Sequence, residues 1–117
     1  WNGRRALVAE WYDELLPDEV VRPAVPDGLT HVYHLYVIRH PRRDDIAAAC
    51  RERQVDCAAY YTTPAHLQPA FADLGHKAGD LPNTDEAAAT NLALPMHPNL
   101  TRGQVAEVAA AVAAGLA

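Results

Sequence analysis

The sequence predicts an α+β fold: a small two-layer domain of about three mainly antiparallel strands, with helices packed on one face. The chain has 117 residues, 50% of them hydrophobic, which is enough for one core and no internal domain boundary. Strand-like and helix-like patterns alternate along it, but the strand patterns are few. Two of the connections between them are too irregular for right-handed parallel crossovers, which favours antiparallel pairing.

Residues 1–30 predict a linking helix followed by an extended linker. Three hydrophobic side chains recur at four-residue intervals: Leu7, Trp11 and Leu15. That spacing is typical of an amphipathic helix, and Pro17 ends it. Residues 17–30 hold three prolines and a glycine, a composition that favours an extended connection between two domains. The helical pattern is already under way at Trp1, so we expect the chain to have been cut from a longer protein.

Residues 31–117 predict the small domain itself. The expected elements, in order, are strand 31–39, helix 44–54, strand 55–62, helix 67–74, helix 83–91, strand 92–96 and a terminal helix after Thr101. In the first strand, alternation predicts that Tyr33, Leu35 and Val37 face the core. Two helix starts have the spacing of a capping box: Asn83 with Glu86, and Thr101 with Gln104.

Composition and charge exclude several classes of function. The net charge of −5, with dispersed arginines, argues against a nucleic-acid-binding surface. Cys50 and Cys57 match neither a CxxC redox pair nor a zinc site, so we expect two reduced thiols in a cytoplasmic protein. His31 and His34 fall on opposite faces of the expected strand, so we expect no metal site. The longest apolar stretch, 108–117, is too short to span a bilayer.

Six motifs occur along the chain in a fixed order. They are Trp1–Arg5 with Tyr12, His31–Arg39, Arg43–Asp44, Tyr60–Phe71, Gly79–Pro82 with Glu86, and Leu94–Pro98 with Leu100–Thr101. With these motifs the chain resembles the C-terminal, small domain of the DegT/DnrJ/StrS group of nucleotide-sugar aminotransferases, within fold-type I of the pyridoxal-phosphate enzymes. The most specific motif is Tyr60–Phe71, which is similar to the family's His-Tyr-Pro-x-Pro-x-His-x-Gln-x-Ala-Tyr stretch. Tyr60 and Thr62 depart from it, at positions where relatives carry histidine and proline.

The resemblance implies an enzyme that moves an amino group, usually from glutamate, to a keto-sugar nucleotide, with pyridoxal phosphate as the cofactor. In the family, the lysine that binds the cofactor belongs to the larger N-terminal domain. The one lysine here, Lys77, lies in an expected solvent loop, so we expect no catalytic residue in this chain and no activity of the chain alone. The resemblance also implies a homodimer and a role in deoxyaminosugar biosynthesis, for an antibiotic or a polysaccharide.

Three residues are the candidates for substrate binding: His66, Tyr60 and Tyr61. The resemblance implies that the small domain covers the active site, where excluding water and positioning the substrate lower the barrier. His66 has the chemistry to donate a hydrogen bond or carry charge toward a sugar diphosphate, and a packed histidine on the 67–74 helix is the alternative. Tyr60 and Tyr61 alternate on the expected strand, so only one of them is expected to face the site.

A second interpretation is a stand-alone, non-catalytic small domain that binds a nucleotide sugar or a partner subunit. No glycine-rich phosphate loop supports it. It would also leave the apolar stripe of the first helix without a partner, at a cost in solubility. A pyridoxal-phosphate domain preceding Trp1 would exclude this interpretation.

Overall fold

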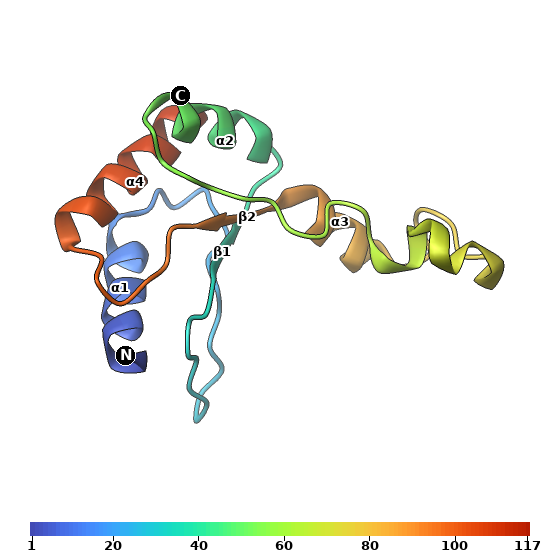
Figure 1. Ribbon diagram of the computed structural model, residues 1–117, viewed down its shortest axis with the longest axis horizontal. Coiled ribbons are helices and arrows are strands. Elements are labelled where there is room, and N and C mark those ends of the chain that lie inside the picture. The colour runs from blue at the N-terminus through green and yellow to red at the C-terminus, as the bar shows by residue number, and fades with distance from the viewer.

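The computed structural model describes residues 1–117 and is an α+β domain, as predicted. Helices and strands follow one another in the order α1, β1, α2, η1, η2, α3, β2 and α4, where η1 and η2 are 3₁₀ turns (Figure 1). Their bounds are α1 Asn2–Leu15, β1 Tyr36–Arg39, α2 Arg43–Glu52, η1 Ala65–Leu67, η2 Pro69–Leu74, α3 Pro82–Thr90, β2 Asn91–Leu94 and α4 Arg102–Leu116. The predicted order of elements is therefore present, except for one strand and for the helix over 67–74, which two 3₁₀ turns replace.

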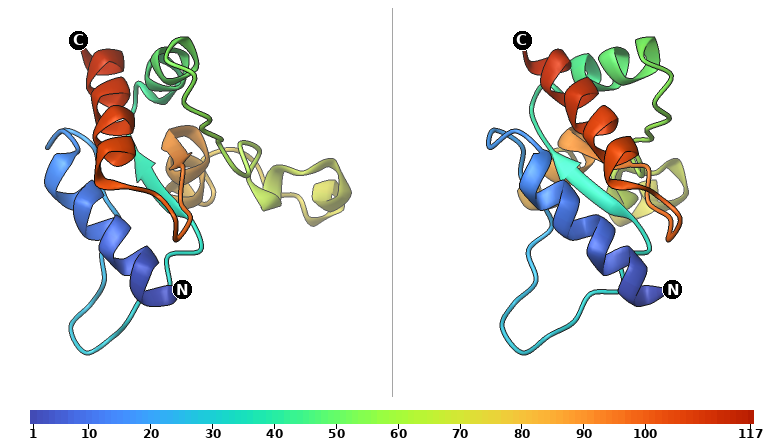
Figure 2. Two further views of the ribbon diagram at one scale, coloured as in Figure 1. Left: turned by 60° about the vertical axis from the view of Figure 1, so that its left-hand side comes forward. Right: turned by 90° about the vertical axis from the view of Figure 1, so that its left-hand side faces the viewer.

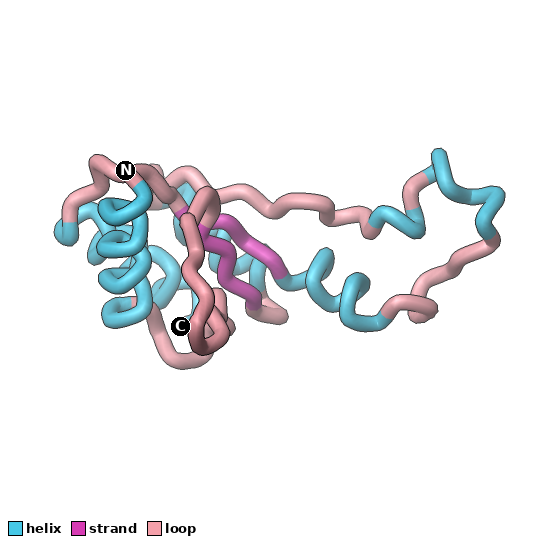
Figure 3. The backbone as a smooth tube through the Cα atoms, turned by 90° about the horizontal axis from the view of Figure 1, so that it is seen from below, coloured by secondary structure: helices cyan, strands magenta, loops and turns pink.

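The sheet has two antiparallel strands rather than about three. β1 and β2 are four residues each and pair over their full length, with Tyr36 opposite Leu94 (Figure 3). The expected strand over 55–62 is reduced to one bridge between Ala58 and Ala93, with N···O distances of 3.1 and 2.7 Å. Beyond this bridge the chain leaves the sheet, so the prediction of a third full strand is wrong.

One hydrophobic core joins the sheet to α1, α2 and α4, which stand together on one side of the strands (Figure 2). α2 and α4 approach most closely at Gly115. A Cβ atom on that glycine would lie 2.5 Å from Ile46 Cα and 2.9 Å from Ile46 N. Both distances are well inside van der Waals contact with backbone atoms, so the close packing of these two helices requires glycine at this position.

α1 buries a different stripe from the predicted one. Val8, Ala9, Tyr12 and Leu16 are buried. The predicted stripe is only half-buried: Leu7, Trp11 and Leu15. Both stripes follow the helical period and lie side by side, so the sequence does not choose between them. The structure buries the stripe of Val8, Ala9, Tyr12 and Leu16, because α4 packs against α1. This contact places α1 in the same core as the rest of the domain. The division of the chain at residue 30 stays a prediction.

The buried face of β1 is also the reverse of the prediction. Tyr36 and Ile38 are fully buried, whereas Leu35 is 36% exposed. Tyr33 has a φ of 47° and the chain bends at the next two residues, so the alternation expected from residue 31 does not continue into the strand. A shift of one residue in a strand moves every side chain to the opposite face.

Two stacked tyrosines connect α1 to the sheet. The rings of Tyr12 and Tyr36 lie 4.7 Å apart between centroids. The Tyr12 hydroxyl donates a hydrogen bond to the Pro95 carbonyl oxygen at 2.7 Å, and the Tyr36 hydroxyl donates to the Asp13 carboxylate. Burial raises the pKa of both phenols above their ordinary value, and in Tyr36 the hydrogen bond to Asp13 adds to it.

Residues 59–90 form an arm that projects away from this core (Figure 1). The arm contains η1, η2 and α3, and only Pro64, His66 and Ala88 are buried within it. We refer to the rest of the chain as the body. The radius of gyration of 15.6 Å exceeds the roughly 13 Å expected for a compact chain of this length, as the projecting arm requires.

The predicted amphipathic helix over 67–74 is absent. Two 3₁₀ turns occupy this part of the arm, and Phe71 and Leu74 are 46% and 67% exposed. The apolar residues of 67–74 do have helical spacing, but no other part of the chain covers the face that they would form. A helix of this length depends on such tertiary packing.

The predicted helix ends have mixed outcomes. The Thr101–Gln104 capping box is confirmed: Thr101 Oγ1 accepts from Gln104 N at 3.3 Å, and Gln104 Oε1 accepts from Thr101 N at 3.0 Å. The prediction of a box at Asn83 is wrong, because α3 begins with Pro82 and has no side-chain cap. Gly75 ends η2 with a φ of 74°, a left-handed conformation that glycine adopts without strain.

Candidate functional site

A cleft of about 690 Å³ lies where the arm meets the sheet. One wall is a face of α3 and its C-cap, with the helical spacing i, i+3, i+4, i+7: Thr84, Ala87, Ala88 and Asn91. The opposite wall comes from the segment that enters the arm: Tyr60, Tyr61, Pro64 and Ala65. β1 and the residues before it complete the lining with His34, Leu35 and Val37. The cleft is therefore built by three segments that are distant in sequence.

Both predicted tyrosines line this cleft. Tyr60 is 45% exposed and Tyr61 is 86% exposed, and neither belongs to a strand. The expectation that they alternate on a strand is wrong, because Tyr61 adopts a φ of 49° and neither side chain is in the core. A positive φ breaks the alternation of an extended chain, so two consecutive side chains can border one cavity.

His66 lies outside the cleft lining, although Pro64 and Ala65 belong to it. The His66 side chain is 5% exposed, and its Nε2 lies 3.2 Å from Asp85 Oδ1 in the first turn of α3. Neither ring nitrogen makes a well-directed hydrogen bond, so this contact is a close approach of the two side chains rather than an aligned bond. The other carboxylate oxygen of Asp85 accepts the Gly79 N–H at 2.7 Å. His66 is thus placed to hold the arm together, and its contact with a substrate stays a prediction.

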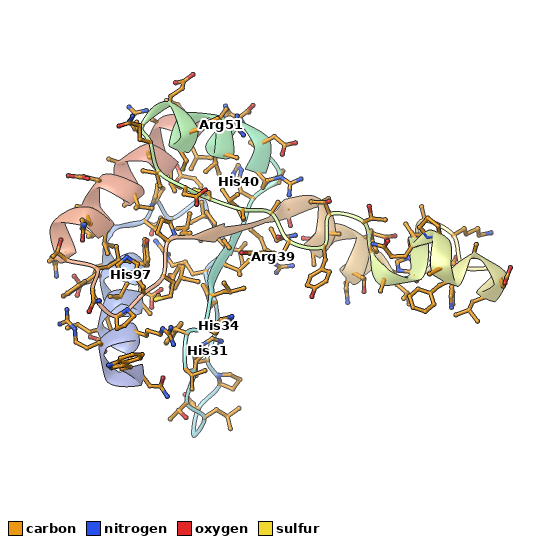
Figure 4. All side chains as sticks on the ribbon, in the orientation of Figure 1. His31, His34, Arg39, His40, Arg51 and His97 are labelled. Atoms are coloured by element: carbon orange, nitrogen blue, oxygen red, sulfur yellow. The ribbon has the colours of Figure 1, made fainter.

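The cleft is apolar with few polar groups. Its lining contains no lysine, arginine, aspartate or glutamate. His34 is its only histidine, and Figure 4 shows it in the loop that leads into β1. Tyrosines beside small side chains suit the flat faces of a sugar or nucleobase ring, because the ring gains apolar contact while the phenol hydroxyl stays available for hydrogen bonding. A diphosphate would find no cationic partner in this lining.

The residues of this chain do not form a site for pyridoxal phosphate. Such a site needs a lysine for the cofactor aldehyde and a carboxylate for its ring nitrogen. Lys77 is exposed on the loop 75–81, and the cleft offers neither group. The expectation that Lys77 lies in a solvent loop is confirmed.

Other candidate chemistry is limited. His31 and His34 lie on the loop before β1, whereas His97 lies near α1 and α4 (Figure 4), and no three His, Cys, Asp or Glu side chains are arranged for a metal ion. Cys50 and Cys57 are free thiols, and hydrogen bonding between them raises the pKa of Cys57 and lowers that of Cys50. None of the helices has both the length and the apolar character needed to cross a membrane.

The fold is that of a small α+β domain found in aminotransferases, and comparison with known proteins gives the family. Residues 1–113 match the DegT/DnrJ/EryC1/StrS aminotransferase family, and the chain belongs to it. The solved structure of Streptomyces venezuelae DesV in complex with a ketimine intermediate superimposes with a TM-score of 0.90 and 34% sequence identity. The superposition covers 96% of this chain and 31% of that one.

Two relatives extend this comparison. A pleiotropic regulatory protein of Geobacillus stearothermophilus is 44% identical over 89% of this chain and 29% of its own length. The dTDP-3-amino-3,4,6-trideoxy-α-D-glucose transaminase of Micromonospora megalomicea is 40% identical over 84% of this chain and 28% of its own length. The chain therefore spans about 30% of the length of its relatives, as expected for the predicted C-terminal portion. Members of the family bind pyridoxal phosphate or its amino form.

Sequence reasoning missed the α3 wall of the cleft. Thr84, Ala87, Ala88 and Asn91 were treated as part of an alanine-rich helix with no special role. Their i, i+3, i+4, i+7 spacing was visible, but small residues on one face of a helix more often mark close packing than a cavity. Only the position of the Tyr60 segment opposite this face shows that the space between them is open.

Proposed function

We propose that this chain is the C-terminal portion of a pyridoxal-phosphate-dependent aminotransferase that transfers an amino group from glutamate to a keto-sugar nucleotide. The catalytic lysine and the cofactor contacts lie in a preceding domain, and this chain alone is inactive. The full-length enzyme acts in the cytoplasm as a homodimer in deoxyaminosugar biosynthesis. Membership of the family supports this proposal, together with the absence of a lysine from the cleft.

Within that enzyme, Tyr60 and Tyr61 contact the nucleotide sugar, and the cleft receives one of its rings. The observation that carries this part is the exposure of both tyrosines on one apolar cleft that has no charged side chain. The diphosphate is then bound elsewhere in the enzyme, by groups that the cleft does not provide. Closing such a cleft over the substrate excludes water from the reacting atoms.

The test uses the full-length enzyme and the Tyr60→Ala substitution. Losing one aromatic contact with the substrate is expected to raise the KM for the nucleotide sugar about tenfold, which corresponds to about 1.4 kcal/mol. The KM for L-glutamate is expected to stay the same, since the amino donor does not carry the ring that the cleft receives. Steady-state kinetics with each substrate varied in turn give both values.

Phe71→Ala is the matched control. Phe71 is 46% exposed against 45% for Tyr60, and it lies in the same arm but outside the cleft. The two variants lose comparable exposed aromatic surface, so they differ mainly in the contact with the cleft. Equal KM values for the nucleotide sugar in the two variants would remove Tyr60 from the proposed site.

A further inference from the structure

The side chain of Asn91 continues the sheet at the point where the backbone ladder stops. The bridge between Ala58 and Ala93 fixes an antiparallel register in which Tyr60 stands opposite Asn91. At that position the Asn91 carboxamide takes the place of a main-chain peptide group. Its Oδ1 accepts the Tyr60 N–H at 2.8 Å, and its Nδ2 donates to the Tyr60 carbonyl oxygen at 2.9 Å. The backbone groups of Asn91 are used elsewhere: its N–H donates to the Ala87 carbonyl oxygen, and its carbonyl oxygen accepts from Arg43 Nη1 at 3.1 Å.

The same amide group also ties this contact to the end of α3. Nδ2 lies 2.9 Å from the Ala87 carbonyl oxygen and 3.3 Å from that of Ala88, two acceptors in the last turn of the helix. A neutral amide is suited to this position because it offers one acceptor oxygen and two N–H donors. A carboxylate would keep only the contact with the Tyr60 N–H, and an aliphatic side chain would keep none.

The segment that carries the two tyrosines has almost no other main-chain anchor. Residues 59–63 make no hydrogen bond to another backbone group. The bonds they do make are the two between Tyr60 and Asn91, and one from Gln68 Nε2 to the Thr63 carbonyl oxygen at 2.9 Å. Asn91 is therefore the one attachment that fixes Tyr60 across the cleft from the α3 wall.

We propose that Asn91 is a positioning residue, which sets the width of the cleft by holding Tyr60 against the C-terminal end of α3. It acts through Tyr60, and the inference rests on the proposed function, in which Tyr60 contacts the nucleotide sugar. Without the carboxamide, the segment 59–63 has no partner across the ladder and separates from α3. The ring of Tyr60 then no longer faces the small side chains of the opposite wall.

The test compares Asn91→Leu and Asn91→Asp with wild type in the full-length enzyme. Titration calorimetry with dTDP-glucose and UDP-glucose measures ligand binding, and hydrogen exchange of the peptide spanning residues 58–63 measures the anchor directly. Asn91→Leu is expected to weaken binding about tenfold and to speed exchange of the Tyr60 amide by at least as much. Asn91→Asp keeps the acceptor for the Tyr60 N–H, so both effects are expected to be smaller.

Thr101→Ala is the control for a general loss of stability. It removes the cap of α4, none of whose residues lines the cleft, and it is expected to change neither the Kd nor the exchange of residues 58–63. Spectroscopic titration of the bound cofactor with L-glutamate is expected to be the same in all the variants. A merely structural role for Asn91 would disturb this reaction as well.

Three results would overturn the inference in different ways. If wild type binds the nucleotide sugars and Asn91→Leu binds them equally well, Asn91 does not position the site and the proposed function stands. If wild type binds neither nucleotide sugar, the proposed function fails and the inference fails with it. Faster exchange in Thr101→Ala equal to that in Asn91→Leu would also overturn it, because the effect would then reflect global opening.

Discussion

The body and the arm of this chain are stabilised in different ways. In the body, α1, α2, α4 and the sheet share one core, in which Tyr12, Tyr36 and Ile46 are fully buried. In the arm, η2 has no buried residue, and the chain is held by a few polar contacts, chiefly those of Asn91 and the pair His66–Asp85. Hydrophobic burial in the body resists local opening, whereas single polar contacts leave a segment free to adjust. The candidate site lies where these two regions meet.

The difference in stability between body and arm is the one expected of a small domain that closes over a substrate. Binding segments need low local stability in order to move, while the scaffold that carries them must stay rigid. The arm supplies the α3 wall and the Tyr60 segment of the cleft, and the body completes the lining with β1 and the residues before it. The three predictions below test the comparison, from the largest expected effect on stability to the smallest.

Gly115→Ala is expected to destabilise the body by about 3 kcal/mol, because the new methyl group would overlap the backbone of Ile46 and force α2 away from α4. The free energy of unfolding from urea denaturation measures the effect. Gly103→Ala, in the same helix, is the matched control, since its Cβ would meet nothing closer than Thr101 Oγ1 at 3.9 Å. It is expected to be neutral or stabilising by up to about 1 kcal/mol. Equal losses in the two variants would contradict close packing at Gly115.

Tyr12→Phe is expected to lower the free energy of unfolding by about 1–2 kcal/mol at neutral pH, because the Pro95 carbonyl oxygen loses its donor. Burial raises the pKa of Tyr12 in the folded state above its unfolded value of about 10. The folded protein therefore keeps a proton that the unfolded chain releases as the pH rises through about 10, and stability falls there. Wild type should lose more stability than Tyr12→Phe between about pH 9 and 11. Parallel pH profiles would show that Tyr12 is not buried as described.

His66→Ala is expected to change the global free energy of unfolding by less than about 0.5 kcal/mol, since the arm adds little to the core. Its effect should be local: faster hydrogen exchange across residues 75–85, which the Asp85 carboxylate holds through Gly79. His76→Ala is the control, because that side chain is 44% exposed and lies 3.7 Å from its partner Asp80. Weaker binding of the nucleotide sugar with unchanged exchange would instead support His66 as a substrate contact.

Much of the fold could be predicted from the sequence because local signals and tertiary packing agreed. The Thr101–Gln104 capping box, the terminal helix and the order of elements needed only neighbouring residues. The wrong predictions concern which face of an element is buried and whether it has a packing partner, and neighbouring residues do not determine either. The buried stripe of α1 was chosen by α4, the face of β1 was inverted by the positive φ of Tyr33, and the 67–74 pattern had no partner to pack against.

The residues of the candidate site could likewise be predicted only where a local motif marks them. Tyr60 and Tyr61 were predicted from a motif, and both border the cleft. His66 came from the same motif but faces Asp85 instead, because the chain turns at η1 and directs that side chain towards α3. Asn91 could not be found from sequence, since its role depends on the register between two segments more than 30 residues apart.

By itself, the sequence determined the α+β class, the family to which the chain belongs, the absence of a catalytic lysine from its motifs, and the tyrosines of the candidate site. These properties depend on residue types and on spacings within single elements. Only the tertiary structure decided which face of each element is buried, that Tyr60 and Tyr61 share one cleft, and that Asn91 bonds to the backbone of Tyr60. Those outcomes depend on contacts between distant segments, and local patterns do not encode which of two equivalent faces such a contact will cover.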